Sequence, residues 1–227
     1  MLEMTLLILA SALWVGVHFG IAGTVARARI VARTGEAGFR IGYSLLSVVA
    51  IVLLVQAWNT APYVELWLAP DWLRWLIALL MLPAFVLFVA ALGTPNPTAV
   101  AGRLGAEGPR GIQRITRHPM LWSFALWAGL HLLAKGTLGG VFFFGAFLVT
   151  ALAGMASIDR KIIARDPEMA ARLLPATSII PFKAVLTGRN RLALGEIPRF
   201  VWIVAGVAWV ALLVAHPWIF GYPALPF

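Results

Sequence analysis

Apolar runs of about twenty residues, separated by polar stretches, follow one another along almost the whole chain. Each run has the length of ~20 residues that a helix needs to cross a bilayer core. No strand-length alternation appears, and a helix satisfies its own backbone hydrogen bonds in hydrocarbon. The pattern predicts an all-α polytopic membrane protein with six transmembrane helices, at about residues 4–26, 41–58, 73–93, 119–134, 138–158 and 200–220.

Composition supports this class of protein, because 61% of the residues are hydrophobic and only 12% are charged. No internal repeat is visible, so we expect one domain over residues 1–227. Two long loops, at about 94–118 and 159–199, collect glycine, proline and charge. In the second loop, Asp166 followed by Pro167 predicts the start of a short amphipathic helix near residues 167–174.

The basic residues predict the orientation in the membrane. All of the 18 Lys and Arg residues except Arg74 and Lys135 fall in the first, third and fifth connections between the predicted spans. The positive-inside rule then places these connections in the cytoplasm and both termini outside it. The net charge of +9 is therefore a signal of topology, and we do not expect a nucleic acid as a partner.

Few residues in the predicted spans are equipped for chemistry. The chain has no cysteine, which excludes disulfides and thiolate sites. The interior of the spans lacks acids and bases, which argues against an ion pump or a coupled transporter. Histidine is the exception, since His18, His131 and His216 fall inside predicted spans and His118 lies at a boundary. An imidazole in hydrocarbon requires a hydrogen-bonding partner or a metal.

Depth in the membrane limits which histidines could share a metal. With ~1.5 Å per residue, His18 lies roughly 13 Å from the cytoplasmic boundary, His131 about 21 Å and His216 about 25 Å. Depth therefore favours His131 together with either His18 or His216, and does not choose between them. His18 and His131 each follow a tryptophan by four residues, Trp14 and Trp127, whereas His216 lies at a helix end. A hydrogen bond to a neighbouring carbonyl is the competing role for each of them.

Four stretches of the chain resemble the NnrU family of integral membrane proteins, which includes 15-cis-zeta-carotene isomerase. They are "HFG" at 18–20, "TPNP" at 94–97, "RITRHPMLW" at 114–122 with "LH" at 130–131, and "LPATSIIPFKAVLTGR" at 174–189. The resemblance extends over nearly the whole chain and implies the same helical membrane fold.

The resemblance also implies a heme b held between helices by two histidines, which match His18 and His131. It implies heme-dependent redox or cis-trans isomerase chemistry at these histidines on a lipophilic polyene. Trp14 and Trp127 would line the cofactor, and Arg117 and His118 would lie near it if the propionates face the cytoplasm. Ala128 stands where the isomerase has a cysteine. The bacterial branch of the family takes its name from a link to nitrite and nitric oxide reduction. We expect this chain in the bacterial inner membrane, and the positive-inside rule then places both termini in the periplasm.

Two other functions are consistent with the same residues. "RHP" at 117–119 also resembles membrane methyltransferases that use S-adenosylmethionine, in which such a pair contributes to a cytoplasmic cofactor site. A proline at the first position of a membrane helix is the competing explanation for this motif. The third hypothesis is a non-enzymatic heme sensor or assembly factor that binds a diatomic gas. Turnover of a substrate would distinguish an enzyme from such a sensor.

Overall fold

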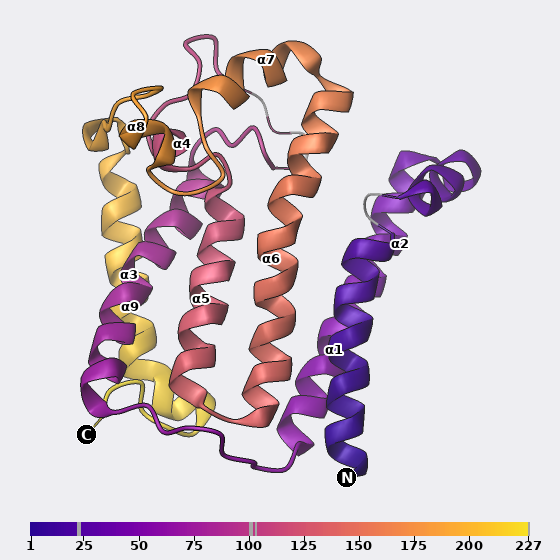
Figure 1. Cartoon of the computed structure of the whole chain (residues 1–227), viewed down its shortest axis with the longest axis vertical. Helices are drawn as coiled ribbons and strands as arrows, with labels where there is room; N and C mark the ends of the chain where they lie inside the picture. The colour runs from indigo at the N-terminus through magenta and orange to yellow at the C-terminus, as the bar shows by residue number, and fades with distance from the viewer. Residues whose placement is uncertain (22–23, 100–101, 103, 227) are drawn as a thin grey trace. The chain divides into compact units, whose positions relative to one another are not determined.

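The computed structural model describes residues 1–21, 24–99, 102 and 104–226, and over these ranges it is an all-helical chain (Figure 1). Arg103, which belongs to the predicted cytoplasmic charge, lies outside them. An isolated antiparallel bridge between Glu65 and Thr137 is the one β-pairing in the described part. The helices are α1 (Leu2–Gly20), α2 (Val25–Thr60), α3 (Asp71–Gly93), α4 (Ile112–Ile115), α5 (Pro119–Lys135), α6 (Leu138–Arg165), α7 (Pro167–Ala176), α8 (Lys183–Leu186) and α9 (Arg199–Phe220).

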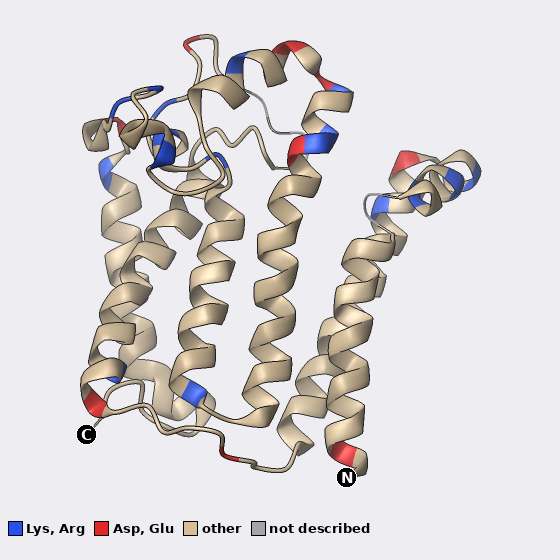
Figure 2. Ribbon diagram, in the orientation of Figure 1, with Lys and Arg blue, Asp and Glu red and all other residues tan. Residues whose placement is uncertain are grey.

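A helix occupies each of the six predicted spans, so the prediction of an all-α polytopic membrane protein is confirmed. Within the described ranges, α1, α2, α3, α6 and α9 are long and apolar enough to cross a membrane. The fourth predicted span is α5, whose 17 residues make it the shortest of the six. In α1, α3, α6 and α9 the charged residues lie near the helix ends, and the middle of each helix carries none (Figure 2).

The first two helices differ from the prediction in their bounds. The first span was expected to reach residue 26, but α1 ends at Gly20, and α2 begins at Val25 rather than near residue 41. The arginine-rich stretch was interpreted as a loop, yet alanine, arginine and valine tolerate a helix well. Thr24 starts this helix by accepting a hydrogen bond from the Ala26 amide at 3.2 Å.

A kink at Gly35 divides α2. Its φ of 71° and ψ of 170° interrupt the helical backbone in a conformation that glycine adopts without strain. The Arg27 guanidinium reaches across the kink to the Glu36 carboxylate at 2.8 Å and lies over the Phe39 ring at 5.0 Å. The first part of α2 is therefore turned away from the apolar part that follows.

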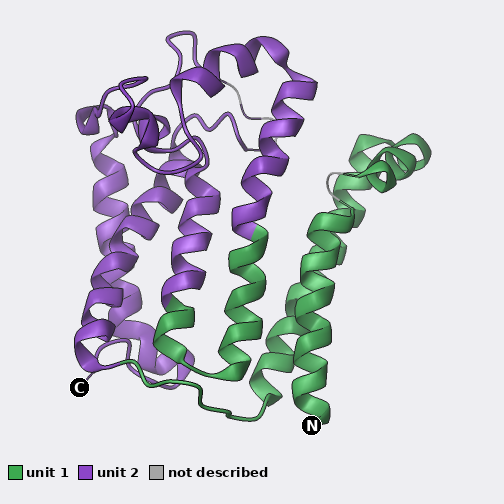
Figure 3. Cartoon of the chain, viewed as in Figure 1, with its two compact units in different colours: residues 1–69, 131–150 green, residues 70–130, 151–227 purple. Residues whose placement is uncertain are grey.

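The chain divides into two compact units (Figure 3). Unit 1 consists of residues 1–69 and 131–150, and unit 2 of residues 70–130 and 151–227. The expectation of a single domain over residues 1–227 stays a prediction. Each unit buries apolar side chains of its own, such as Leu7 and Leu54 in unit 1 and Leu173 and Val201 in unit 2.

In unit 1, α1 packs along α2, and a strap between residues 61 and 69 is tied to the turn after α5. The Leu66 and Trp67 amides both donate to the Gly136 carbonyl, at 2.8 and 3.0 Å, and the Leu138 amide donates to the Val64 carbonyl. Gly136 has a φ of +56°, and a Cβ atom at this position would overlap the Trp67 carbonyl oxygen. Only glycine allows the strap to approach so closely.

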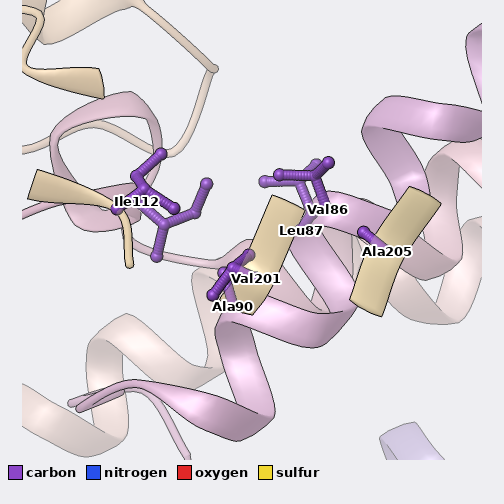
Figure 4. Packing of buried hydrophobic residues seen from close by; sticks show 7 residues of the cluster. Val86, Leu87, Ala90, Ile112, Val201 and Ala205 are labelled. Atoms are coloured by element: carbon purple, nitrogen blue, oxygen red, sulfur yellow. The ribbon is translucent and has the colours of Figure 1, made fainter. Parts of the chain in front are cut away.

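In unit 2, α3 and α9 form the main helix pair. A buried apolar cluster from α3, α4 and the segment around α9 joins them, and most of its side chains are labelled in Figure 4. Its members are Val86, Leu87, Ala90, Ile112, Ile197, Val201 and Ala205. This cluster packs α4 and the first part of α9 against α3.

The predicted amphipathic helix in the second long loop is confirmed as α7. The Asp166 side chain caps it by accepting a hydrogen bond from the Met169 amide at 2.9 Å, and Pro167 is its first residue. Met169 and Leu173 point to the buried side, where they pack with Ile162 of α6.

Substitution of Gly136 by alanine tests the strap in unit 1. We expect the free energy of unfolding to fall by at least about 2 kcal/mol, because a positive φ and a steric overlap add together. The measurement is thermal unfolding of the detergent-purified protein. Gly145→Ala in α6 is the control, since a Cβ there meets open space, and it should leave the midpoint unchanged or raise it. Equal losses in both variants would show that the close approach does not matter.

Candidate functional site

The first group of candidate residues surrounds His18 in unit 1. His18 Nδ1 donates a hydrogen bond to the Trp14 carbonyl oxygen, one helical turn earlier, at 2.8 Å. The Trp14 ring packs on the imidazole with the centroids 4.2 Å apart, and the Tyr43 ring approaches its edge at 6.0 Å. Since Nδ1 carries the proton, the lone pair of His18 is on Nε2.

A row of aromatic rings leads from His18 to His131 within the same unit. Trp14 packs against Phe147 of α6 at 4.8 Å, and Phe147 contacts Phe143 at 5.3 Å. Phe144 lies 5.1 Å from Phe143 and 5.3 Å from the His131 ring. The surroundings of both histidines therefore meet at a single turn of α6, between residues 143 and 147.

Two buried polar atoms without a hydrogen-bond partner lie on the same side of α1 as His18. They are the Ser11 hydroxyl and the Trp14 indole nitrogen. Positions 11, 14 and 18 share one face of a helix. Buried polar atoms are seldom left unpaired in a folded protein, and such exceptions often mark a group that binds there.

The residues in unit 1 have the chemistry that a histidine-ligated heme requires. A ligating histidine normally donates its other ring N–H to a carbonyl or carboxylate, which is the arrangement at His18. Aromatic and aliphatic side chains surround it, and unpaired polar atoms lie on the same helix face. Trp127 and Ala128, which precede His131 on α5, belong to unit 2, where Trp127 is half-buried and Ala128 is fully buried.

The remaining candidates in the spans have local partners. The Ser123 hydroxyl on α5 donates to the Met120 carbonyl at 2.7 Å. His216 lies in unit 2, where its Nδ1 donates to the Tyr222 carbonyl at 2.7 Å and its ring packs on Phe220. This agrees with the interpretation of His216 as a residue of a helix end.

The second group of candidate residues is a buried ionic cluster in unit 2. The Arg117 guanidinium binds the Asp159 carboxylate with two nitrogens, at 2.5 to 3.1 Å. His118 Nε2 donates to the same carboxylate at 2.9 Å. The imidazole of His118 is fully buried, and its Nδ1 has no partner. Asp159 therefore accepts hydrogen bonds from both polar residues of the "RHP" motif.

The backbone around Arg117 is bonded to two other stretches of unit 2. The Thr98 hydroxyl donates to the Arg117 carbonyl at 2.9 Å, and the Arg117 amide donates to the Ser178 carbonyl at 3.1 Å. The Thr116 hydroxyl donates to the Ile179 carbonyl at 2.9 Å. Three of the stretches quoted from the sequence, around residues 94–98, 114–122 and 174–189, thus meet at the cluster.

A second ion pair joins α4 to the segment that precedes α9. Arg114 binds the Glu196 carboxylate at 2.7 and 3.0 Å, and the Gly111 amide donates to it at 2.9 Å. The hydrogen bonds from Arg114, followed by the one from Gly111, lower the pKa of Glu196 to about 2. The Asn190 side chain accepts a further hydrogen bond from Arg114.

Asp159 is the residue that the sequence analysis missed. The fifth span was expected to end at residue 158, and the acid after it was assigned to a cytoplasmic loop. Instead α6 continues to Arg165, and Asp159, the first residue after the predicted span, is buried within this helix. The sequence contained a signal for this residue: Asp159 is a single acid directly after an apolar run, in a chain that also has the Arg-His pair of the "RHP" motif.

The fold and the two clusters together define a multi-pass, all-α membrane protein with two histidines among aromatic rings in one unit and a buried Arg-His-Asp cluster in the other. A family model described as "NnrU protein" matches residues 6–224. The chain belongs to the NnrU family.

One curated relative is the chloroplastic 15-cis-zeta-carotene isomerase of Zea mays. It is 30% identical to this chain over 110 residues, which are 47% of this chain and 30% of the maize protein. The match thus spans less than a third of the length of that relative. No solved structure matches the chain.

Replacement of Asp159 by asparagine tests the buried cluster. We expect the free energy of unfolding to fall by roughly 3–5 kcal/mol, because Arg117 would keep a buried charge without its counter-ion. The measurement is unfolding in detergent, with Glu107→Gln as the control. Glu107 pairs with Arg110 at the exposed surface, and exposed ion pairs contribute little. A loss no larger than that of the control would contradict a structural role for Asp159.

The low pKa of Glu196 predicts a dependence of stability on pH. A carboxylate with a lowered pKa in the folded state stabilises it above the unfolded value of 4.5, and this contribution is lost as the pH falls towards about 2. The unfolding midpoint of the native chain should therefore fall more than that of Glu196→Gln between pH 6 and pH 3. Parallel pH profiles would show that the ion pair does not form in solution.

Proposed function

We propose that this protein binds heme b through His18 and His131 and acts as a heme-dependent cis-trans isomerase on a lipophilic polyene. The observation that carries the proposal is the row of aromatic contacts in unit 1, which connects both histidines to a single turn of α6. Membership of the NnrU family and the partial match to a carotene isomerase support the same function.

The residues of unit 1 have separable roles in this proposal. The Trp14 carbonyl holds the His18 ring in one orientation and presents Nε2 as the ligand atom. Phe143, Phe144 and Phe147 supply an apolar wall that excludes water. Bound heme supplies one-electron redox chemistry. Ala128 carries a methyl group where the isomerase has a cysteine, so no thiol from this position takes part.

The substrate in this proposal enters from the bilayer, because a polyene partitions into hydrocarbon. The membrane would be the bacterial inner membrane, with both termini in the periplasm and the Arg117 cluster at the cytoplasmic side, as the distribution of basic residues indicates.

Arg117 and His118 are bound to Asp159, and His118 has no exposed surface. This favours a structural role for the "RHP" motif over a site for S-adenosylmethionine.

Alanine variants of the histidines test the heme proposal. The purified protein should show a Soret band and sharp reduced α and β bands of a six-coordinate heme b, at one heme per chain. His18→Ala and His131→Ala should each lose the heme or its low-spin spectrum, since each removes one axial ligand. His216→Ala is the matched control and should keep both, because its ring is bonded to Tyr222 in unit 2.

Unchanged spectra in both His18→Ala and His131→Ala would overturn the ligand assignment. A separate assay, turnover of a cis polyene by the heme-loaded protein, distinguishes an enzyme from a sensor. Conversion of a cis polyene by the heme-loaded protein, lost in the two ligand variants, supports an isomerase. Binding of nitric oxide without conversion of any polyene would instead support the sensor.

A further inference from the structure

An open groove of about 370 Å³ lies between α1 and α2 in unit 1. Its walls are mainly leucines and alanines, from Leu6 to Leu13 on α1 and from Leu53 to Thr60 on α2. None of the proposed heme ligands lines it. The volume lies within the range of roughly 300–1,000 Å³ that is usual for small-molecule sites.

The positions that line the groove form one face of each helix. They are spaced by three and four residues, as Leu6, Leu9 and Leu13 are on α1, so the groove runs along the helices for ~10 Å. Leu9 is 60% exposed and Leu53 is 43% exposed. In a membrane these open side chains face lipid, and the groove is accessible from the bilayer.

Gln56 is the polar group that could recognise a ligand in the groove. Gln56 is exposed at the open side of the groove, and its side-chain amide has no hydrogen-bond partner among the described residues, whereas the nearby Thr60 hydroxyl is bonded to the Gln56 carbonyl at 3.3 Å. An unpaired amide is unfavourable in hydrocarbon. Gln56 lies one turn from the end of α2, close in sequence to Trp58 and Trp67, and tryptophans are enriched at the membrane interface.

We propose that this groove binds one acyl chain of a glycerophospholipid, with the ester carbonyl of the lipid accepting a hydrogen bond from Gln56 Nε2. The apolar walls suit an acyl chain, and the amide near the helix end suits an ester close to the headgroup. A hydrocarbon polyene would leave Gln56 unpaired. A fatty-acid carboxylate would lack a cation, because neither Lys nor Arg lines the groove. The proposal does not depend on heme binding.

Native mass spectrometry of the delipidated, detergent-purified protein, titrated with dioleoyl phosphatidylglycerol, tests the site. The native chain should bind one lipid with saturation. Leu53→Trp fills the groove and should weaken this binding by about tenfold or more. Val52→Trp is the matched control, because Val52 is the adjacent residue, is 47% exposed and does not line the groove. Equal binding by the two variants would overturn the proposal.

The hydrogen bond is tested with a second variant and a second lipid. Gln56→Leu should weaken binding of the ester lipid by about fivefold, the ratio expected for one ordinary hydrogen bond. Binding of the dialkyl ether analogue, which lacks the carbonyl, should be the same for Gln56→Leu and the native chain. A similar loss with both lipids would refute the assigned contact. Co-purification of a polyene in the groove, in place of a phospholipid, would refute the assigned occupant.

Discussion

The polar end of unit 2 depends on one carboxylate, that of Asp159. Its charge is balanced by Arg117, and His118 donates the remaining hydrogen bond to it. A buried ion pair of this kind adds little to the free energy of unfolding compared with an apolar pair of similar size. Loss of one partner is nevertheless strongly destabilising, because the other charge stays buried without a counter-ion. The backbone on both sides of Arg117 is bonded to segments near Thr98 and Ser178. The carboxylate therefore fixes loops that come from three parts of the chain.

The two units differ in how they stabilise polar groups in apolar surroundings. Unit 2 buries ions and balances them, with Asp159 as the shared acceptor. Unit 1 uses neutral groups around its histidines: an imidazole bonded to a backbone carbonyl, an indole and a hydroxyl. The aromatic row contributes no charge at all. The surroundings of the histidines in unit 1 are thus suited to a lipophilic group, and the ionic cluster of unit 2 to holding polar loops in place.

The sequence predicted the helices well because a run of apolar residues long enough to cross a bilayer has few alternative structures. The sequence also predicted the start of α7, because an acid followed by a proline is a local signal for the beginning of a helix. It did not predict the kink in α2, since Gly35 resembles any other loop glycine. The pairing of Arg117 with Asp159 joins residues far apart in the chain, which no local pattern encodes. The candidate histidines were found because imidazoles are rare in such helices, while the aromatic row between them depends on how α6 packs.

His18 lies two residues from the end of α1, where a helix loosens most easily. Its ring is nevertheless bonded to the Trp14 carbonyl, a full turn further into the helix. Fraying of the last residues of α1 would therefore leave the direction of the imidazole unchanged. The Trp14 carbonyl thus ties the ring to the part of α1 that lies a full turn away from the helix end.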